Sequence, residues 1–232
     1  MATPAKAMNA ERVARVLPGI RGLSLGLAVV TAEVLVLGLH LASSAASYTD
    51  PLALAYPFVW VNAALLGVWV ADVPEAVGRR RLAAGAVAGG YLLVLAYFGG
   101  VLSPGYGLVG GTDTASPGWY VSSGLPPGYG PAAVYESALA TVVLVPYKLV
   151  GYATLAYLVY GTVVDAARTG VAGVLGLLSC VSCSWPVLAA LVSGVAGSGS
   201  AVAAATMDQS LGLSTVVFVV TVALLAWRPT FG

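Results

Sequence analysis

The chain has 232 residues, of which 59% are hydrophobic and only 8% are charged, and its formal net charge is +1. Soluble domains carry about 25% charged residues, so this composition excludes an ordinary water-soluble globule. The small net charge also gives no reason to expect a nucleic-acid partner. We therefore predict an integral membrane protein that is embedded in the lipid bilayer and has lipid as its main partner.

The N-terminal segment, residues 1–22, carries several basic residues before the first apolar stretch: Lys6, Arg12, Arg15 and Arg21. That stretch is longer than the apolar core of a signal peptide and has no convincing cleavage site, which predicts a retained anchor. We expect residues 1–22 to lie in the cytoplasm. Residues 23–232 are expected to form a single transmembrane domain.

Several segments have the length of about 20 apolar residues that a membrane span needs. They are Leu23–Ala42, Leu52–Val70, Leu82–Leu102, Ala132–Val164, Val171–Gly194 and Leu211–Trp227. The predicted fold is therefore all-α, a polytopic bundle of six transmembrane helices. The fourth segment is too long for one upright span. We expect Pro146 to divide it into an outer, tilted or interfacial helix and a true span that begins near Tyr147.

The positions of the basic residues predict the orientation. Nine of the ten Lys and Arg residues lie on one side of the predicted spans, whereas the three outer segments, 43–51, 103–131 and 198–210, contain none. The positive-inside rule places the basic side in the cytoplasm. We therefore predict a multi-pass cell-membrane protein with both termini cytoplasmic. Lys148 is the basic residue that departs from this pattern.

The outer segment 103–131 contains a near-repeat. Its two copies are Pro104-Gly-Tyr-Gly and Pro127-Gly-Tyr-Gly. Pro-Gly pairs set turns, and Tyr and Trp favour the membrane–water interface. This pattern predicts a compact cap on the outer surface. A loop that docks a partner or gates a substrate is the alternative.

Polar residues within the predicted spans are functional candidates, because ionisable groups are costly inside a bilayer. Glu33 and His40 lie on one face of the first span, seven residues apart. Lys148 and Asn62 are expected at a depth comparable with that of Glu33. We expect a Glu33–Lys148 ion pair that holds two helices together. The alternative is a proton or cation path that uses Glu33 and His40.

Cys180 and Cys183 are the only two cysteines, and they lie in an apolar segment just before Pro186. Residues three apart share one helix face, which suits two thiolates on one Cu(I) or a similar soft ion. Met207 or His40 would be a further soft ligand or relay group. A structural zinc site would need a second ligand pair, which the chain lacks. Two other roles stay open: packing of small side chains and thiol–disulfide exchange.

The run from Gly176 to Leu188, which includes both cysteines and Pro186, resembles the cysteine–proline helix of mercury-transport membrane proteins. It is more distantly similar to the cysteine–proline helices of membrane thiol-relay proteins. The first resemblance implies that the chain handles a soft metal ion. The whole chain also resembles an uncharacterised group of small archaeal membrane proteins, a likeness that implies no activity.

The chain contains no Gly-x-x-x-x-Gly-Lys-Ser/Thr run, so we expect no ATP-binding loop. The preferred function is handling of a soft, copper-like metal ion in or across the membrane through Cys180 and Cys183. The alternative is a non-catalytic accessory or assembly subunit of a larger membrane complex. A membrane thiol oxidoreductase comes third. A role without catalysis is favoured over an enzymatic one.

Overall fold

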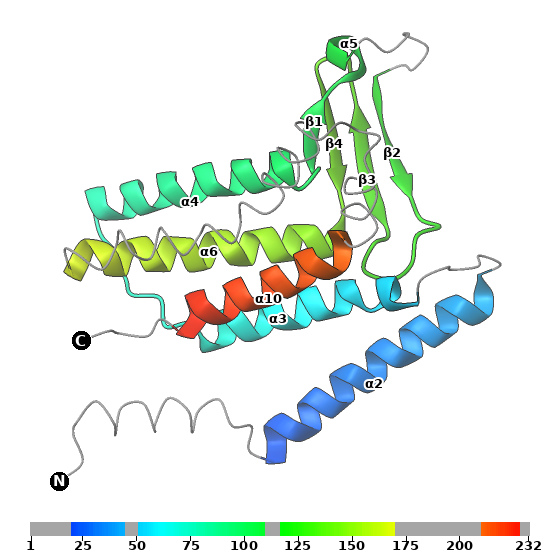
Figure 1. Cartoon of the computed structure of the whole chain (residues 1–232), viewed down its shortest axis with the longest axis horizontal. Coiled ribbons are helices and arrows are strands. Elements are labelled where there is room, and N and C mark those ends of the chain that lie inside the picture. The colour runs from blue at the N-terminus through cyan, green and yellow to red at the C-terminus, as the bar shows by residue number, and fades with distance from the viewer. Residues whose placement is uncertain (1–19, 45–50, 110–116, 170–209, 228–232) are drawn as a thin grey trace. The chain divides into compact units, whose positions relative to one another are not determined.

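The computed structural model describes residues 20–44, 51–109, 117–169 and 210–227 (Figure 1). The chain divides into two compact units, Met1–Ser47 and Tyr48–Gly232. In the first unit, the described residues form one apolar helix, α2 (Ile20–Ser43). The described residues of the second unit form a bundle of helices and an antiparallel sheet.

The bundle of the second unit contains α3 (Tyr56–Val70), α4 (Arg79–Phe98), α6 (Pro146–Thr169) and α10 (Ser210–Trp227). A 3₁₀ turn, η1 (Leu52–Leu54), precedes α3, and a single turn, α5 (Tyr106–Val109), follows α4. Pro57 and Pro146 lie in the first turns of α3 and α6, where a missing N–H costs no helical hydrogen bond. The predicted division at Pro146 is confirmed, because α6 begins there.

The prediction of a helix over residues 131–145 is wrong. This segment is a hairpin of β3 (Ala132–Glu136) and β4 (Ala140–Leu144), and with β1 (Leu102–Pro104) and β2 (Gly118–Ser122) it forms a sheet of order β1-β4-β3-β2. All neighbouring strands are antiparallel. Valine, threonine and tyrosine in runs of five residues favour strands over helix. The fold is therefore mostly helical with a sheet, and not all-α.

Three helices in the described parts of the chain are long and apolar enough to cross a membrane. They are Gly22–Ser43, Leu52–Val70 and Arg79–Phe98, and the apolar part of α10, Leu211–Ala226, is shorter. The described residues therefore do not support six spans. α6 has the length, but it carries Lys148, Asp165 and Arg168. The predicted span Val171–Gly194 lies outside the described residues.

The third predicted span ends earlier than expected. α4 stops at Phe98, and Leu102 already belongs to β1. Gly99 closes the helix, since its N–H donates to the carbonyl of Leu95 at 2.7 Å. Gly100 then adopts a φ of +72°, a left-handed conformation that glycine reaches without strain. The Gly99-Gly100 pair therefore turns the chain from the bundle into the sheet.

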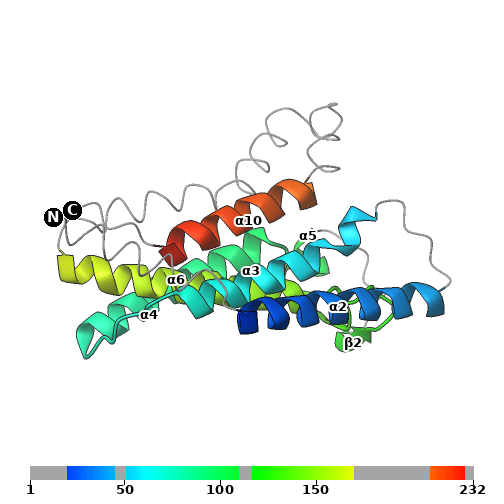
Figure 2. The same ribbon diagram turned by 90° about the horizontal axis from the view of Figure 1, so that it is seen from below.

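α6 is the central helix of the bundle, because it contacts α3, α4 and α10. The four helices lie roughly along a common axis, with α4 antiparallel to the other three (Figures 1 and 2). Leu158 of α6 is fully buried, and Leu155 and Val159 lie beside it in the core. The residues in the middle of α6 thus face protein on most sides.

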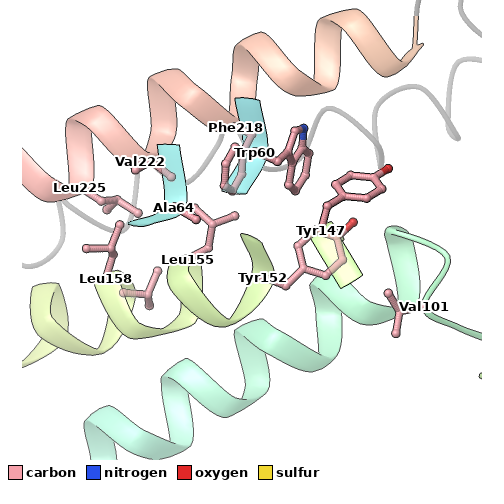
Figure 3. Packing of buried hydrophobic residues seen from close by; sticks show 11 residues of the cluster. Trp60, Ala64, Val101, Tyr147, Tyr152, Leu155, Leu158, Phe218, Val222 and Leu225 are labelled. Carbon is pink, nitrogen blue, oxygen red and sulfur yellow. The ribbon is translucent and has the colours of Figure 1, made fainter. Parts of the chain in front are cut away.

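The core is aromatic at the end of the bundle nearest the sheet (Figure 3). The Trp60 and Phe218 rings are stacked with centroids 3.9 Å apart, and the Tyr147 and Tyr152 rings meet Trp60 edge-on at 5.4 and 5.9 Å. The indole N–H of Trp60 donates to the Thr215 hydroxyl at 3.0 Å. This bond satisfies the polar atom of a buried indole.

The sheet is joined to one end of the bundle. Its strands run crosswise to the helices, with β1 at the end of α4 and β2 at the far edge (Figure 1). Val101 just before β1 is buried in the helical core, and Leu144 at the end of β4 packs against it. The same hydrophobic core therefore fixes both the helices and the base of the sheet.

Candidate functional site

The first Pro-Gly-Tyr-Gly copy, residues 104–107, is hydrogen-bonded to the turn of the β3–β4 hairpin. The N–H of Gly105 donates to the carbonyl of Leu139 at 3.0 Å, and the N–H of Gly107 donates to that of Ala138 at 3.1 Å. A Cβ atom on Gly105 would collide with the backbone of Ser137 and Ala138. Glycine is therefore required at this position, because the two backbones touch.

The second copy, residues 127–130, contacts the starts of the helices α3 and α6. Tyr129 donates its hydroxyl to the carbonyl of Ala53 at 2.8 Å. Gly128 has a φ of +87°, and a Cβ there would collide with Pro57 at the start of α3. Its carbonyl accepts the N–H of Tyr147 at the start of α6. The near-repeat thus ties the Pro/Gly-rich segment to the hairpin at one end and to the bundle at the other.

The register of the sheet lines up one apolar row across all four strands. Trp119 of β2 is paired with Tyr135 of β3, Tyr135 with Val142 of β4, and Val142 with Leu102 of β1. The Trp119 and Tyr135 rings lie 5.0 Å apart, a cross-strand contact that stabilises the sheet. Side chains alternate along a strand, so Tyr120 points to the opposite face.

On that opposite face, Tyr120 donates its hydroxyl to a carboxylate oxygen of Glu136 at 3.1 Å. The hydrogen bond to Glu136 raises the pKa of the Tyr120 phenol, with smaller contributions from desolvation and the carboxylate charge. The phenol therefore stays protonated and remains a donor at physiological pH. The sheet thus positions the carboxylate of Glu136 through the Tyr120 hydroxyl.

The edge strand β2 is exposed on both faces. Trp119, Tyr120 and Val121 have exposed fractions of 63%, 51% and 65%. The strand contains no charged residue. Edge strands usually carry charges, prolines or bulges that discourage pairing with another chain. β2 has none of these within its five residues, and β3 is its one neighbour among the described strands.

Lys148, the basic residue outside the predicted cytoplasmic side, lies in the first turn of α6. Its ammonium donates to the carbonyl of Gly99 at 2.8 Å. This carbonyl is at the C-terminus of α4, where the helix dipole favours a cation. Lys148 therefore joins α6 to the end of α4.

The other polar candidates lie on α2 and α3. Glu33 and His40 are half-buried on one stripe of α2 together with Leu37, and Asn62 of α3 is half-buried. Glu33 and Lys148 belong to different units. Their ion pair therefore stays a prediction, as does a proton path through Glu33 and His40.

The predicted soft-metal ligands Cys180, Cys183 and Met207 lie outside the described residues. Within residues 20–44, 51–109, 117–169 and 210–227, no group of three or more His, Cys, Asp or Glu residues could hold a metal ion. The copper site remains a hypothesis based on the sequence.

A family of unknown function, DUF7546, matches residues 6–232, which is nearly the whole chain. The chain belongs to this family. No curated protein and no solved structure matches the chain. The family description names neither an organism nor a metal. The archaeal and mercury-transport resemblances of this DUF7546 chain therefore stay predictions.

The projecting sheet of this DUF7546 protein is the feature that sequence reasoning missed. The signal that could have found it is the run Ala-Ala-Val-Tyr-Glu followed by Ala-Thr-Val-Val-Leu, with a short Ser-Ala-Leu turn between them. Two such runs separated by three residues are typical of a hairpin. Judged by hydropathy alone, these two runs are continuous with the helix that follows, and they were therefore predicted to be helical.

Proposed function

We propose that the protein is a multi-pass membrane protein whose sheet stands on the side opposite its cytoplasmic termini. The apolar surfaces of the helices support this placement, as does the distribution of residues along α4. Its first turn holds Arg79, Arg80 and Arg81, and its last turn holds the exposed pair Tyr97 and Phe98. Arginines at one interface and aromatic rings at the other are typical of a spanning helix.

The proposed spans include α2, α3 and α4, with α6 and α10 packed among the helices of the second unit. The apolar segment 171–194 would supply a sixth span. α6 tolerates its charged residues in this arrangement, because Lys148 is bonded to the end of α4 and the middle of the helix is covered by its neighbours.

Within this placement, we propose that the protein acts as a non-catalytic accessory or assembly subunit of a larger membrane complex. The observation that carries the proposal is the exposed, uncharged edge strand β2 on a sheet that projects from the bundle. A partner segment in extended conformation would add to β2 through backbone hydrogen bonds. Trp119 and Val121 would contribute side-chain contacts on one face.

Site-specific photocrosslinking in cells tests this role. A photoreactive residue in place of Trp119 is expected to give a discrete adduct with one partner, whereas the same residue in place of Val77, which is 84% exposed, is not. Val121→Lys places a charge on the edge and should abolish the adduct without lowering the Tm. An adduct that persists in the Val121→Lys protein would contradict strand addition at β2.

Handling of a soft metal ion is the second candidate, and the Cys180-x-x-Cys183 pair in an apolar segment supports it. Two thiolates would hold one Cu(I) in near-linear coordination, with Met207 or His40 as relay groups. The purified protein should then bind about one Cu(I) per chain, both thiols should resist alkylation, and Zn²⁺ should not compete.

Cys180→Ser and Cys183→Ser should each abolish copper binding, because neither thiolate alone completes the site. A protein that binds no copper and tolerates both changes in cells would leave the accessory role as the remaining proposal. A reversible disulfide between the two cysteines would instead favour the third candidate, a thiol oxidoreductase.

A further inference from the structure

The turn of the β3–β4 hairpin and the segment packed on it form one rigid tip, made of residues 104–109 and 137–139. Two backbone hydrogen bonds, from Gly105 to Leu139 and from Gly107 to Ala138, join the two segments. The Ser137 hydroxyl closes the turn by bonding the carbonyl of Ala140 at 2.8 Å. These bonds hold the backbone of the two segments together.

The tip lies beside the bundle and beyond its edge. The strands leave the bundle crosswise, and the tip, marked by α5, lies on the side of α4 and past that helix (Figure 1). β1, the strand nearest the helices, contacts the end of α4. The tip is thus near the level at which α4 ends with Tyr97 and Phe98, where the interface of a surrounding bilayer would lie.

The side chains of the tip are of the kind found at a bilayer interface. Among the tip residues whose side chains the structure describes, Leu139 and Leu108 are large and exposed, with exposed fractions of 75% and 66%. Residues 99–112 and 137–147 contain no Asp, Glu, Lys or Arg. Glu136 directly precedes the tip, but its carboxylate accepts the hydroxyl of Tyr120 on β2. Exposed leucines on a segment without charged residues are costly in water and favoured at the boundary between headgroups and acyl chains.

We infer that the hairpin tip, through Leu108 and Leu139, docks into the interfacial region of the leaflet on the sheet's side. This inference rests on the proposed membrane placement, and it commits to lipid as the occupant of the tip. The sheet is then supported at its base by the helical core and at its tip by lipid. β2, the strand farthest from the helices, stays in water and open to a partner.

Environment-sensitive labelling of the reconstituted full chain tests the inference. Leu139→Cys or Leu108→Cys, in a Cys180→Ser/Cys183→Ser background, would carry an NBD fluorophore in phosphatidylcholine vesicles. We expect a blue-shifted emission that is lost when lipids with a nitroxide near the headgroup are included. Val121→Cys is the matched control, since it has a similar exposed fraction of 65% on β2. Its label should emit as in water and respond to aqueous iodide instead.

Leu93→Cys on α4, which is 64% exposed, separates this inference from the membrane placement. Lipid quenching at Leu93 together with a water-like label at both Leu139 and Leu108 would overturn the docking of the tip and leave the placement intact. A water-like label at Leu93 would contradict the placement itself, and the inference would fail with it. Lipid quenching at Leu93, Leu139 and Leu108, with Val121 in water, is the supporting outcome.

Discussion

Gly151 is the residue of α6 that allows helices to approach most closely at the aromatic core. A Cβ atom there would lie 2.5 and 2.8 Å from two atoms of the Trp60 ring and 3.2 Å from Phe218. Gly85 on α4 is the matched control, because nothing lies within 4 Å of the corresponding position. Both glycines are within helices, so alanine gives each a similar gain of about 1 kcal/mol in helix propensity.

We therefore expect Gly151→Ala to lower the free energy of unfolding by about 1–3 kcal/mol relative to Gly85→Ala, the typical cost of overpacking a core. Thermal unfolding of the two variants in the same detergent measures the difference. Equal Tm values would show that the Trp60 ring moves aside without cost.

Lys148 already has one partner, the Gly99 carbonyl, and the predicted pairing with Glu33 would be a second interaction. Lys148→Met and Glu33→Gln are each expected to lower the Tm, since each leaves a polar group without its counterpart. The double variant should lose less than the sum of the single losses if the two side chains interact. Strictly additive losses would show that Glu33 and Lys148 act independently.

At the scale of elements, the helices were largely predictable and the sheet was not. Residues 23–42, 52–70 and 211–227 are predominantly apolar over the length of a span, so their length and composition identified helices. Val134, Tyr135, Val142 and Val143 are equally apolar, and a hydropathy window does not separate them from α6. Their β-branched and aromatic side chains carried the distinguishing signal. The interactions of the near-repeat could not be predicted, because they depend on a hairpin turn and on Pro57, far away in the sequence.

Gly105 provides a test of the hairpin tip as an element. Gly105→Ala places a methyl group against the backbone of Ser137 and Ala138, which should separate the two segments. We expect faster amide hydrogen exchange at Gly105, Gly107 and the hairpin turn, and unchanged exchange in α6. Gly124→Ala, at a position with open space around it, should leave the exchange pattern unaltered. Loss of protection throughout the bundle would mean that the tip and the helices unfold together.

At the scale of the whole molecule, the charges of the chain predict which side of the proposed membrane each loop faces. In a Cys180→Ser/Cys183→Ser background, Leu125→Cys in the segment after β2 should react with impermeant thiol reagents added outside intact cells. Val77→Cys, close to Arg79–Arg81, should react only after the membrane is opened, because basic loops stay in the cytoplasm. Both side chains are exposed, so burial does not account for a difference. The reverse labelling pattern would invert the proposed topology.

The central position of α6 has a consequence for how the protein is made. α6 carries Lys148, Asp165 and four tyrosines, so lipid is a poor environment for it on its own, yet its inward face fits α3, α4 and α10. During synthesis, α3 and α4 precede it and are apolar enough to enter the bilayer alone. We therefore expect α6 to leave the translocon with the help of these two helices, after the β3–β4 hairpin has crossed. In the proposed membrane, the helix at the centre of the bundle is thus one whose insertion depends on the helices that precede it in the chain.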